Sequence, residues 1–266
     1  DRFFNMGIAE CNMVGVAAGL ASCGKIPFAT SFAMFSAGRA FEQVRNSVGY
    51  PHLNVKIVGS HAGISVGEDG ATHQCCEDIA LMRSIPGMVV LNPADHYEMK
   101  AAVKAAVEYQ GPVYIRLGRL AVDSCNNNDD YSFQIGKGIT LRNGSDITVI
   151  ATGLMVGEAI KAVDNLRKSN IEARLIDMHT VKPIDQEIII KAAKETGRII
   201  TVEEHNIIGG LGEAVAACLS ENCPVPLTRI GVKDVFGHSG PAVDLLEEFG
   251  LCASGIEAAV KEVLNV

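Results

Sequence analysis

The sequence lacks tryptophan, is poor in aromatic residues and contains no long apolar run. Its 266 residues include no Trp, and aromatic side chains make up 5% of the total. Hydrophobic residues still reach 48%, so the core must be built mainly from Ala, Val, Ile and Gly, which is typical of α/β packing. The apolar segments are short and interrupted by polar residues, which excludes a membrane-spanning helix.

The charge and the cysteine pattern argue against two further classes of protein. The net charge of −8 disfavours a general nucleic-acid binder. The eight cysteines form no CxxC pair, so we predict neither a zinc site nor a disulfide framework, and we expect reduced thiols in a cytoplasmic protein. The sequence shows no signal-peptide pattern, and because it begins with Asp1 rather than Met we expect a fragment or a processed form.

Strand-like and helix-like segments alternate along the chain in two blocks. In the first block the patterns predict a helix from about residue 11, and then strands and helices over 26–30, 38–50, 55–60, 71–85, 88–93, 94–109 and 112–118. Residues 121–137 lose all periodicity, which places a domain boundary there. The second block predicts strands starting near residues 146, 172, 198 and 226, with helices over 154–169, 186–197, 213–223 and 256–266. The alternation predicts an α/β fold of two domains, each a mainly parallel sheet flanked by helices.

Glu10 stands at the predicted start of the first helix, among small and apolar residues. The helix dipole favours the charged carboxylate there, whereas burial favours the neutral form. A helix-capping glutamate and a functional carboxyl are both consistent with this position.

The segment 59–79 is rich in glycine, histidine and acidic residues. His61, His73, Asp69 and four glycines fall within it, directly after a predicted buried strand. The segment is too polar for a core and too glycine-rich for an ordinary surface turn. Because α/β sheets bind ligands at the carboxyl ends of their strands, we expect this loop to approach a ligand.

Four motifs occur in the order found in the transketolase family, and the resemblance covers essentially the whole chain. They are NMGIAE-x-NM at 5–13, SFAMFSAGRAFEQVR at 31–45, GSHAGISVGEDGATHQ at 59–74 and GPVYIRLGR at 111–119. The chain resembles the C-terminal half or subunit of a transketolase. The resemblance implies a pyrimidine-binding domain over 1–122, a linker over 123–137 and a transketolase C-terminal domain over 138–266.

The resemblance implies thiamine diphosphate as cofactor. Glu10 matches the family's catalytic glutamate, which bonds a nitrogen of the aminopyrimidine ring, and its role requires a protonated or proton-sharing carboxyl. Phe32 and Phe35 match positions that face this ring, although two core aromatics would give the same pattern. His73 lies where relatives carry His or Gln near the cofactor and substrate. The stretch between Phe35 and Arg39 is one residue longer than in some members of the family.

The same resemblance implies a ketose phosphate donor and an aldose phosphate acceptor, between which a two-carbon unit is transferred. His61 and Asp69 would contact sugar hydroxyls, and Asp69 would read the stereochemistry of the donor. Arg119 would hold the sugar phosphate, for which a guanidinium fork is suited, although a surface ion pair is the simpler interpretation of this residue alone.

The sequence departs from the family pattern by lacking a GDG motif followed by Asn about thirty residues later. That motif holds magnesium and the diphosphate, so the Mg²⁺ ligands would lie on a partner, and no metal ligand is predicted in this chain. By the same resemblance, we expect the first strand and helix of the pyrimidine-binding domain to be absent before Asp1. We therefore expect activity only with an N-terminal half or subunit, in a homodimer or hetero-oligomer, with neither a membrane nor nucleic acid as partner.

Several alternatives remain open. A 1-deoxyxylulose-5-phosphate synthase uses the same glutamate and fold, and the beta subunit of a 2-oxo-acid dehydrogenase or a non-catalytic assembly subunit is also possible. A dinucleotide site at glycines 209, 210 and 212 is disfavoured, because Val215 stands where the third glycine is needed. His179, His205 and His238 are expected to be structural or interfacial.

Overall fold

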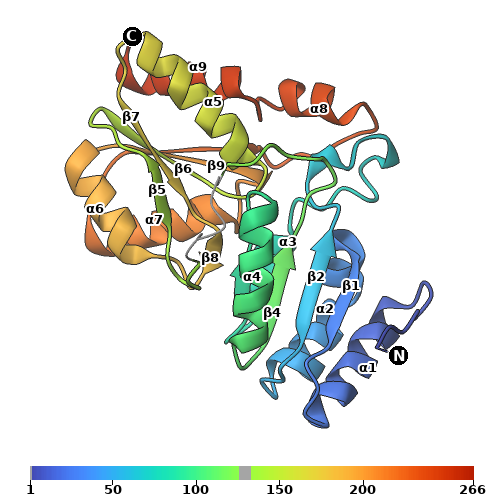
Figure 1. Cartoon of the computed structure of the whole chain (residues 1–266). Helices are drawn as coiled ribbons and strands as arrows, with labels where there is room; N and C mark the ends of the chain where they lie inside the picture. The colour runs from blue at the N-terminus through green and yellow to red at the C-terminus, as the bar shows by residue number, and fades with distance from the viewer. Residues whose placement is uncertain (1, 126–132) are drawn as a thin grey trace.

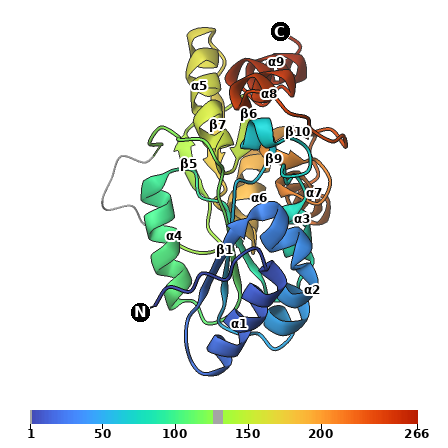
Figure 2. The ribbon, with the colours of Figure 1, turned by 90° about the vertical axis from the view of Figure 1, so that its right-hand side faces the viewer.

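The computed structural model describes residues 2–125 and 133–266, which fold into two five-stranded sheets with helices on their faces. The N-terminal half, blue to green, forms the lower part of the molecule in Figure 1, and the C-terminal half forms the upper part. Figure 2 shows the same two layered parts from the side. The predicted α/β fold class is confirmed.

The first sheet contains a strand contributed by the second half of the chain. Its order is β1 (Phe28–Phe32), β2 (Lys56–Ser60), β4 (Val113–Arg116), β3 (Val89–Leu91) and β8 (Thr180–Lys182). The first four strands are parallel, whereas β8 pairs with β3 in the antiparallel sense. The pattern had predicted only a strand and a proline turn over 172–185, so β8 was missed.

The second sheet has the order β10 (Leu227–Val232), β9 (Ile199–Asn206), β6 (Ile147–Ala151), β7 (Ala173–Asp177) and β5 (Ile139–Arg142). Four of its strands are parallel, and β5, which was not predicted, is an antiparallel edge strand. β6 is completely buried, which explains why it reads as a continuous apolar run.

Helices cover both sheets, and several match the predicted segments. Asp95 caps α4 as predicted, because its side chain accepts a hydrogen bond from the Glu98 N–H at 2.9 Å. The long α-helices are α1 (Glu10–Ser22), α4 (His96–Glu108), α5 (Met155–Lys168), α6 (Gln186–Thr196), α7 (Leu211–Asn222) and α9 (Ala253–Leu264). The shorter elements are η1 (Met34–Arg39), α2 (Phe41–Gln43), η2 (Val44–Gly49), η3 (Ile64–Asp69), α3 (Asp78–Ser84) and α8 (Ala242–Glu248).

Two predicted helices are wrong in extent. The segment predicted as one helix over 38–50 is instead the series η1, α2 and η2, in which η1 and η2 are π-helical. Residues 71–73, with Thr72, form a turn, Cys75 makes an isolated bridge with Gly63, and the helix α3 starts only at Asp78. The reason is that this segment bonds elsewhere, since the Cys75 carbonyl accepts the Gly63 N–H at 2.8 Å. The short helix α8 was not predicted.

The expected linker over 123–137 includes residues 126–132, which lie outside the described part of the chain. All eight cysteines lie within the described part, and each is unpaired. Among the described residues, no helix combines the length and apolar character that a membrane crossing requires.

Candidate active site

The carboxyl group of Glu10 lies at the first residue of α1, where the chain enters the helix from Gly7. Glu10 is 6% exposed, and its two oxygens have separate partners. The Ser31 hydroxyl donates to Oε1 at 3.3 Å, and Arg39 Nη1 donates to Oε2 at 3.1 Å. The position is therefore a buried carboxylate held from β1 and η1, not a simple helix cap.

The π-helical segment η1 presents an aromatic ring and a guanidinium together. Arg39 stacks over the Phe35 ring at 4.7 Å while it also pairs with Glu10. A π-helical turn accommodates one more residue than an α-helical turn and often occurs at functional sites. In η1 this turn places the Arg39 guanidinium against the Phe35 ring.

Four rings form a contiguous group beside Glu10. Phe32 stacks on His61 with ring centroids 4.0 Å apart, and Phe35 lies 6.3 Å from Phe32. His73 meets Phe35 edge-on at 5.3 Å and Phe32 at 6.4 Å. These rings offer flat apolar surfaces edged by imidazole nitrogens, which suits a flat heterocycle.

His61 is placed by the loop that follows β2. Its backbone is left-handed, with φ of 55°, which few non-glycine residues adopt. Ser60 Oγ lies 3.0 Å from its Nδ1. Burial, and then the nearby Arg119 charge, lower the pKa of His61, while Asp69 opposes them, so the ring is neutral at pH 7 and can both donate and accept a hydrogen bond.

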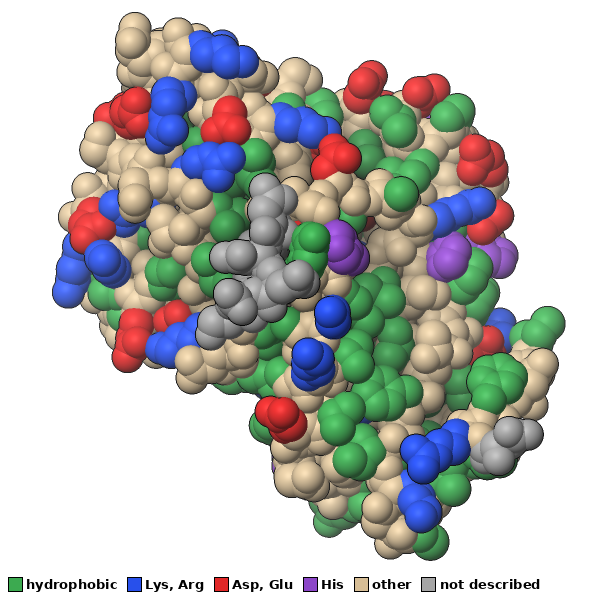
Figure 3. Space-filling view, in the orientation of Figure 1, with side chains coloured by type: hydrophobic (Ala, Val, Ile, Leu, Met, Phe, Trp, Pro, Cys, Tyr) green, Lys and Arg blue, Asp and Glu red, His purple; other side chains and the backbone are tan. Residues whose placement is uncertain are grey.

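Asp69 and Arg119 form a half-exposed pair at the outer end of the same loop. Arg119 Nη1 lies 3.5 Å from Asp69 Oδ2 and also donates to the Val66 carbonyl. The Arg119 side chain is 39% exposed and the Asp69 side chain is 41% exposed, so both can reach a polar ligand. In the space-filling view, histidine side chains reach the surface where the two parts of the molecule meet (Figure 3).

The structure brings all seven predicted site residues into one connected array. It runs from Glu10 through Arg39 to the aromatic group, and then through His61 to Asp69 and Arg119. Ser31 and Arg39, the two partners of Glu10, were missed, although both lie inside the motif at 31–45. The roles assigned to the seven residues remain predictions.

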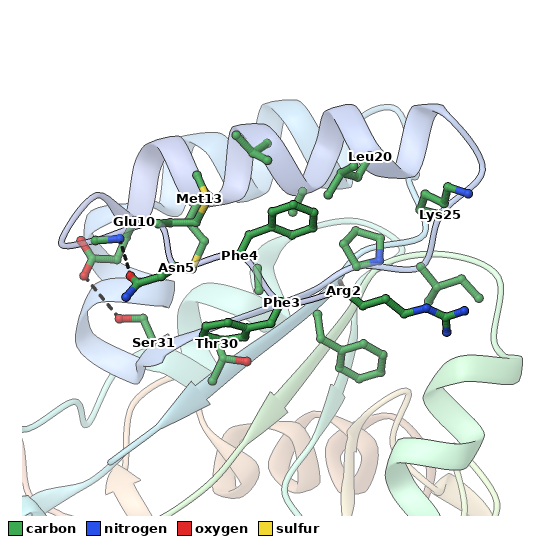
Figure 4. A pocket seen from close by; sticks show the side chains of 18 of the residues that line it. Arg2, Phe3, Phe4, Asn5, Glu10, Met13, Leu20, Lys25, Thr30 and Ser31 are labelled. Carbon is green, nitrogen blue, oxygen red and sulfur yellow. Dashed lines mark hydrogen bonds between the residues drawn. The ribbon is translucent and has the colours of Figure 1, made fainter.

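A pocket of about 970 Å³ opens between α1, β1 and the N-terminal segment. Figure 4 shows Phe3 and Phe4 between the helix and the strand, and Ser31 directed toward Glu10. Among the predicted site residues only Glu10 lines this pocket. The aromatic group therefore lies outside it, and Glu10 stands between the two regions.

The glycine-rich turn before α7 is already occupied by a side chain of the same domain. The Glu203 carboxylate accepts the Leu211 and Gly212 N–H groups at 2.6 and 2.7 Å. A phosphate would have to displace a buried carboxylate from this helix N-terminus, which agrees with the expectation that no dinucleotide binds here. His179 and His205 are buried, and His238 is exposed with its Nε2 3.0 Å from Glu248.

Family models match both halves of the chain. Residues 1–123 match "Transketolase, pyrimidine binding domain", and residues 136–256 match "Transketolase, C-terminal domain". The chain belongs to the transketolase family. It corresponds to the C-terminal part of that family, because residues 136–256 match the C-terminal domain and a relative is named as a C-terminal section. The chain spans 42% of the length of mouse transketolase, to which it is 39% identical.

Close relatives of this transketolase-family chain include separate subunits. A protein of Methanocaldococcus jannaschii, provisionally named as a transketolase C-terminal section, is 52% identical over all of this chain and 84% of its own length. The 6-deoxy-6-sulfo-D-fructose transketolase subunit SqwH of a Clostridium species is 49% identical over 98% of this chain and 81% of its own. A solved structure described as a split gene transketolase, inactive beta4 tetramer, superposes with a TM-score of 0.91 at 50% identity, over 99% of this chain and 84% of that one.

Glu10 and the nearby aromatic residues have the chemistry needed to bind the pyrimidine half of thiamine diphosphate. The buried Glu10 carboxyl is linked through Arg39 to the flat Phe35 ring, and a carboxyl together with aromatic faces suits a flat nitrogen heterocycle. Within residues 2–125 and 133–266, no group of three or more His, Cys, Asp or Glu is placed to hold a metal ion.

Proposed function

We propose that this chain is the C-terminal subunit of a split, thiamine diphosphate-dependent transketolase. The reaction transfers a two-carbon ketol unit from a ketose phosphate to an aldose phosphate. One observation carries the proposal: in a pyrimidine-binding domain of this family, Glu10 is buried and connected through Arg39 to the ring group and to Asp69 and Arg119.

Glu10 is the catalytic residue in this proposal. Thiamine diphosphate, when bound, supplies the carbon centre at which the donor bond is cleaved. Glu10 would hold a proton at the carboxyl oxygen that faces the pyrimidine nitrogen, while Phe32, Phe35 and His73 orient the ring and exclude water. Ser31 donates to Oε1 of Glu10 and Arg39 donates to Oε2, and because each carboxyl oxygen has two lone pairs, Glu10 could keep both partners while its proton faces the pyrimidine nitrogen.

The sugar chain would extend along the outer part of the array. The His61 ring can donate a hydrogen bond to a sugar hydroxyl or accept one from it, and the Asp69 carboxylate oxygens can accept hydrogen bonds from sugar hydroxyls. Arg119 would neutralise the anionic end of the donor. The relatives named for 6-deoxy-6-sulfo-D-fructose and for apulose-4-phosphate support a donor with a terminal anion, and a guanidinium can bind a sulfonate as well as a phosphate.

The diphosphate and Mg²⁺ would be held by an N-terminal partner subunit. The relatives named as subunits and sections of split transketolases support this arrangement. The composite site requires a hetero-oligomer, and cytoplasmic sugar phosphates would be its substrates.

The proposal is tested by ketol transfer in a reconstituted pair. The chain is mixed with the N-terminal subunit of its own source, thiamine diphosphate and Mg²⁺, and transfer between sugar phosphates is measured. Glu10→Gln, which keeps the shape but cannot share a proton in the same way, should lower kcat by at least about 100-fold. A matched control is Glu42→Gln on the exposed α2, which should retain full activity. Near-normal transfer by Glu10→Gln would reject the catalytic assignment.

A further inference from the structure

The loop that carries His61 and Asp69 is held by a carboxylate from the other domain. Glu204 lies on β9 of the second sheet and is 2% exposed. Its Oε1 accepts the backbone N–H of Ser65 at 2.7 Å. Ser65 lies in η3, four residues after His61 and four before Asp69, so this contact pins the middle of the loop.

Gly63 makes room for this carboxylate. Its backbone has φ of +83°, and a Cβ there would lie 2.2 Å from Glu204 Oε1 and 2.3 Å from its Cδ. No other residue could follow this path while Glu204 keeps its place. The glycine and the glutamate are therefore matched across the domain boundary.

A second interdomain contact supports the far end of the loop. Gln74 Nε2 donates to the Ile64 carbonyl at 3.1 Å and to the His238 carbonyl at 2.9 Å. Gly70 is equally close to the second domain, because a Cβ there would lie 2.4 Å from Ser239 Oγ. The segment 237–240 thus covers the same loop that Glu204 holds from within.

Glu204 is itself fixed at its backbone. Arg116 Nη2 donates to the Glu204 carbonyl at 2.7 Å, and its Nε donates to Asp78 at 2.8 Å. The second carboxylate oxygen, Oε2, is buried and has no hydrogen-bond partner among the described residues. A buried carboxylate with one oxygen unpartnered is poorly explained by stability alone, because an apolar residue would avoid that desolvation.

We propose that Glu204 is a positioning residue that fixes the 61–70 loop, so that the C-terminal domain sets the placement of His61 and Asp69 for substrate. The part of this inference that concerns substrate rests on the proposed function. The contact between Glu204 and the loop does not, because it can be tested without activity. It also gives the second domain a task at the site, although that domain contributes no predicted site residue.

The contact is tested first by hydrogen–deuterium exchange on the chain alone. Glu204→Ala removes the acceptor, so the Ser65 amide and the 61–70 peptide should exchange at least about tenfold faster. Glu204→Gln keeps an acceptor oxygen and should stay within about threefold of wild type. Glu203→Gln is the matched control, because this neighbouring buried carboxylate faces α7 and should leave the loop unchanged. Unchanged loop exchange in Glu204→Ala would overturn the inference.

The functional part is tested in the reconstituted pair. Glu204→Ala should raise the donor KM about tenfold or more and leave the affinity for thiamine diphosphate within about twofold, and Glu204→Gln should largely restore the KM. An unchanged donor KM would overturn the positioning role. Should Glu204→Ala not fold, Gly63→Ala perturbs the same contact from the loop side. A wild-type pair without ketol transfer would reject the proposed function, and the exchange result would still decide whether Glu204 holds the loop.

Discussion

Glu10 and Arg39 illustrate what single residues contribute to this site. The carboxyl is 6% exposed and the Arg39 side chain is 51% exposed, so the pair joins a buried acid to a half-exposed base. Glu10 could be predicted from its motif, but its partner could not, because 29 residues separate the two in sequence.

At the same scale, Asp69 is expected to affect substrate more than cofactor or stability. Its ion pair with Arg119, at 3.5 Å, is half exposed, so Asp69→Asn should lower the free energy of unfolding by less than about 1 kcal/mol. The kcat/KM for the donor should fall about 10- to 100-fold, while the Kd of thiamine diphosphate in the reconstituted pair changes less than about threefold. Steady-state kinetics with two donors that differ in hydroxyl stereochemistry provide the measurement, and unchanged donor preference would contradict this role.

At the scale of elements, β4 and the segment after it carry two arginines with opposite surroundings. Arg116 is buried at the last residue of β4 and holds Asp78, whereas Arg119 lies three residues later on the surface. The motif GPVYIRLGR shows both arginines but not which one turns inward. A strand buried on both faces shows no alternation of apolar and polar residues, so the sequence alone could not show which arginine is buried.

Replacing each arginine by methionine compares how much the buried and the exposed ion pair contribute to the free energy of unfolding. Arg116→Met leaves the fully buried Asp78 without its cation, and we expect a loss of about 3–5 kcal/mol in the free energy of unfolding. Arg119→Met should cost less than about 1 kcal/mol, because its pair is exposed. Urea unfolding followed by circular dichroism measures both, and similar losses for the two variants would show that the Arg116 network is not a main support of the fold.

The elements that the pattern missed share a physical cause. The helices α1, α4, α5, α6 and α9 were predictable because each has a periodic apolar face or a capping residue such as Asp95. The segment 71–77 reads as helix, but its Cys75 and Cys76 carbonyls accept hydrogen bonds from the distant Gly63 and Asn206 N–H groups, and the Gln74 side chain donates to the His238 carbonyl. The π-helical turns η1 and η2 and the short helix α8 depend on tertiary packing, which local propensity does not encode.

For the whole molecule, the two halves are joined more closely than the alternating pattern suggests. β8 belongs by sequence to the second half, yet it completes the edge of the first sheet beside β3. A strand of three residues carries no signal of which sheet it will join, because its pairing is non-local. The Glu204 contact with the 61–70 loop lies across the same boundary. The sequence therefore predicted two sheets, but not that the second domain supports the site of the first.

The buried side chain of His179 makes the stability of the fold depend on pH. His179 is 1% exposed, stacks on Phe133 at 4.2 Å, and burial lowers its pKa to about 4 from 6.5. The unfolded chain therefore binds a proton at a higher pH than the folded chain, and stability that is present above about pH 6.5 is lost as the pH falls toward 4. Relative to His179→Phe, wild type should lose about 2 kcal/mol of unfolding free energy between pH 7 and pH 4.5. Urea titrations at both pH values measure this difference, and parallel pH dependence in the two proteins would contradict it.

The central claim is that this chain supplies the pyrimidine half of a site that a partner completes. Calorimetric titration of thiamine diphosphate with Mg²⁺ into the chain alone, and then into the chain with its N-terminal subunit, tests it most directly. The account predicts binding only in the presence of the partner, and loss of that binding or of turnover in Glu10→Gln. Tight binding of thiamine diphosphate and Mg²⁺ to the chain alone would contradict it.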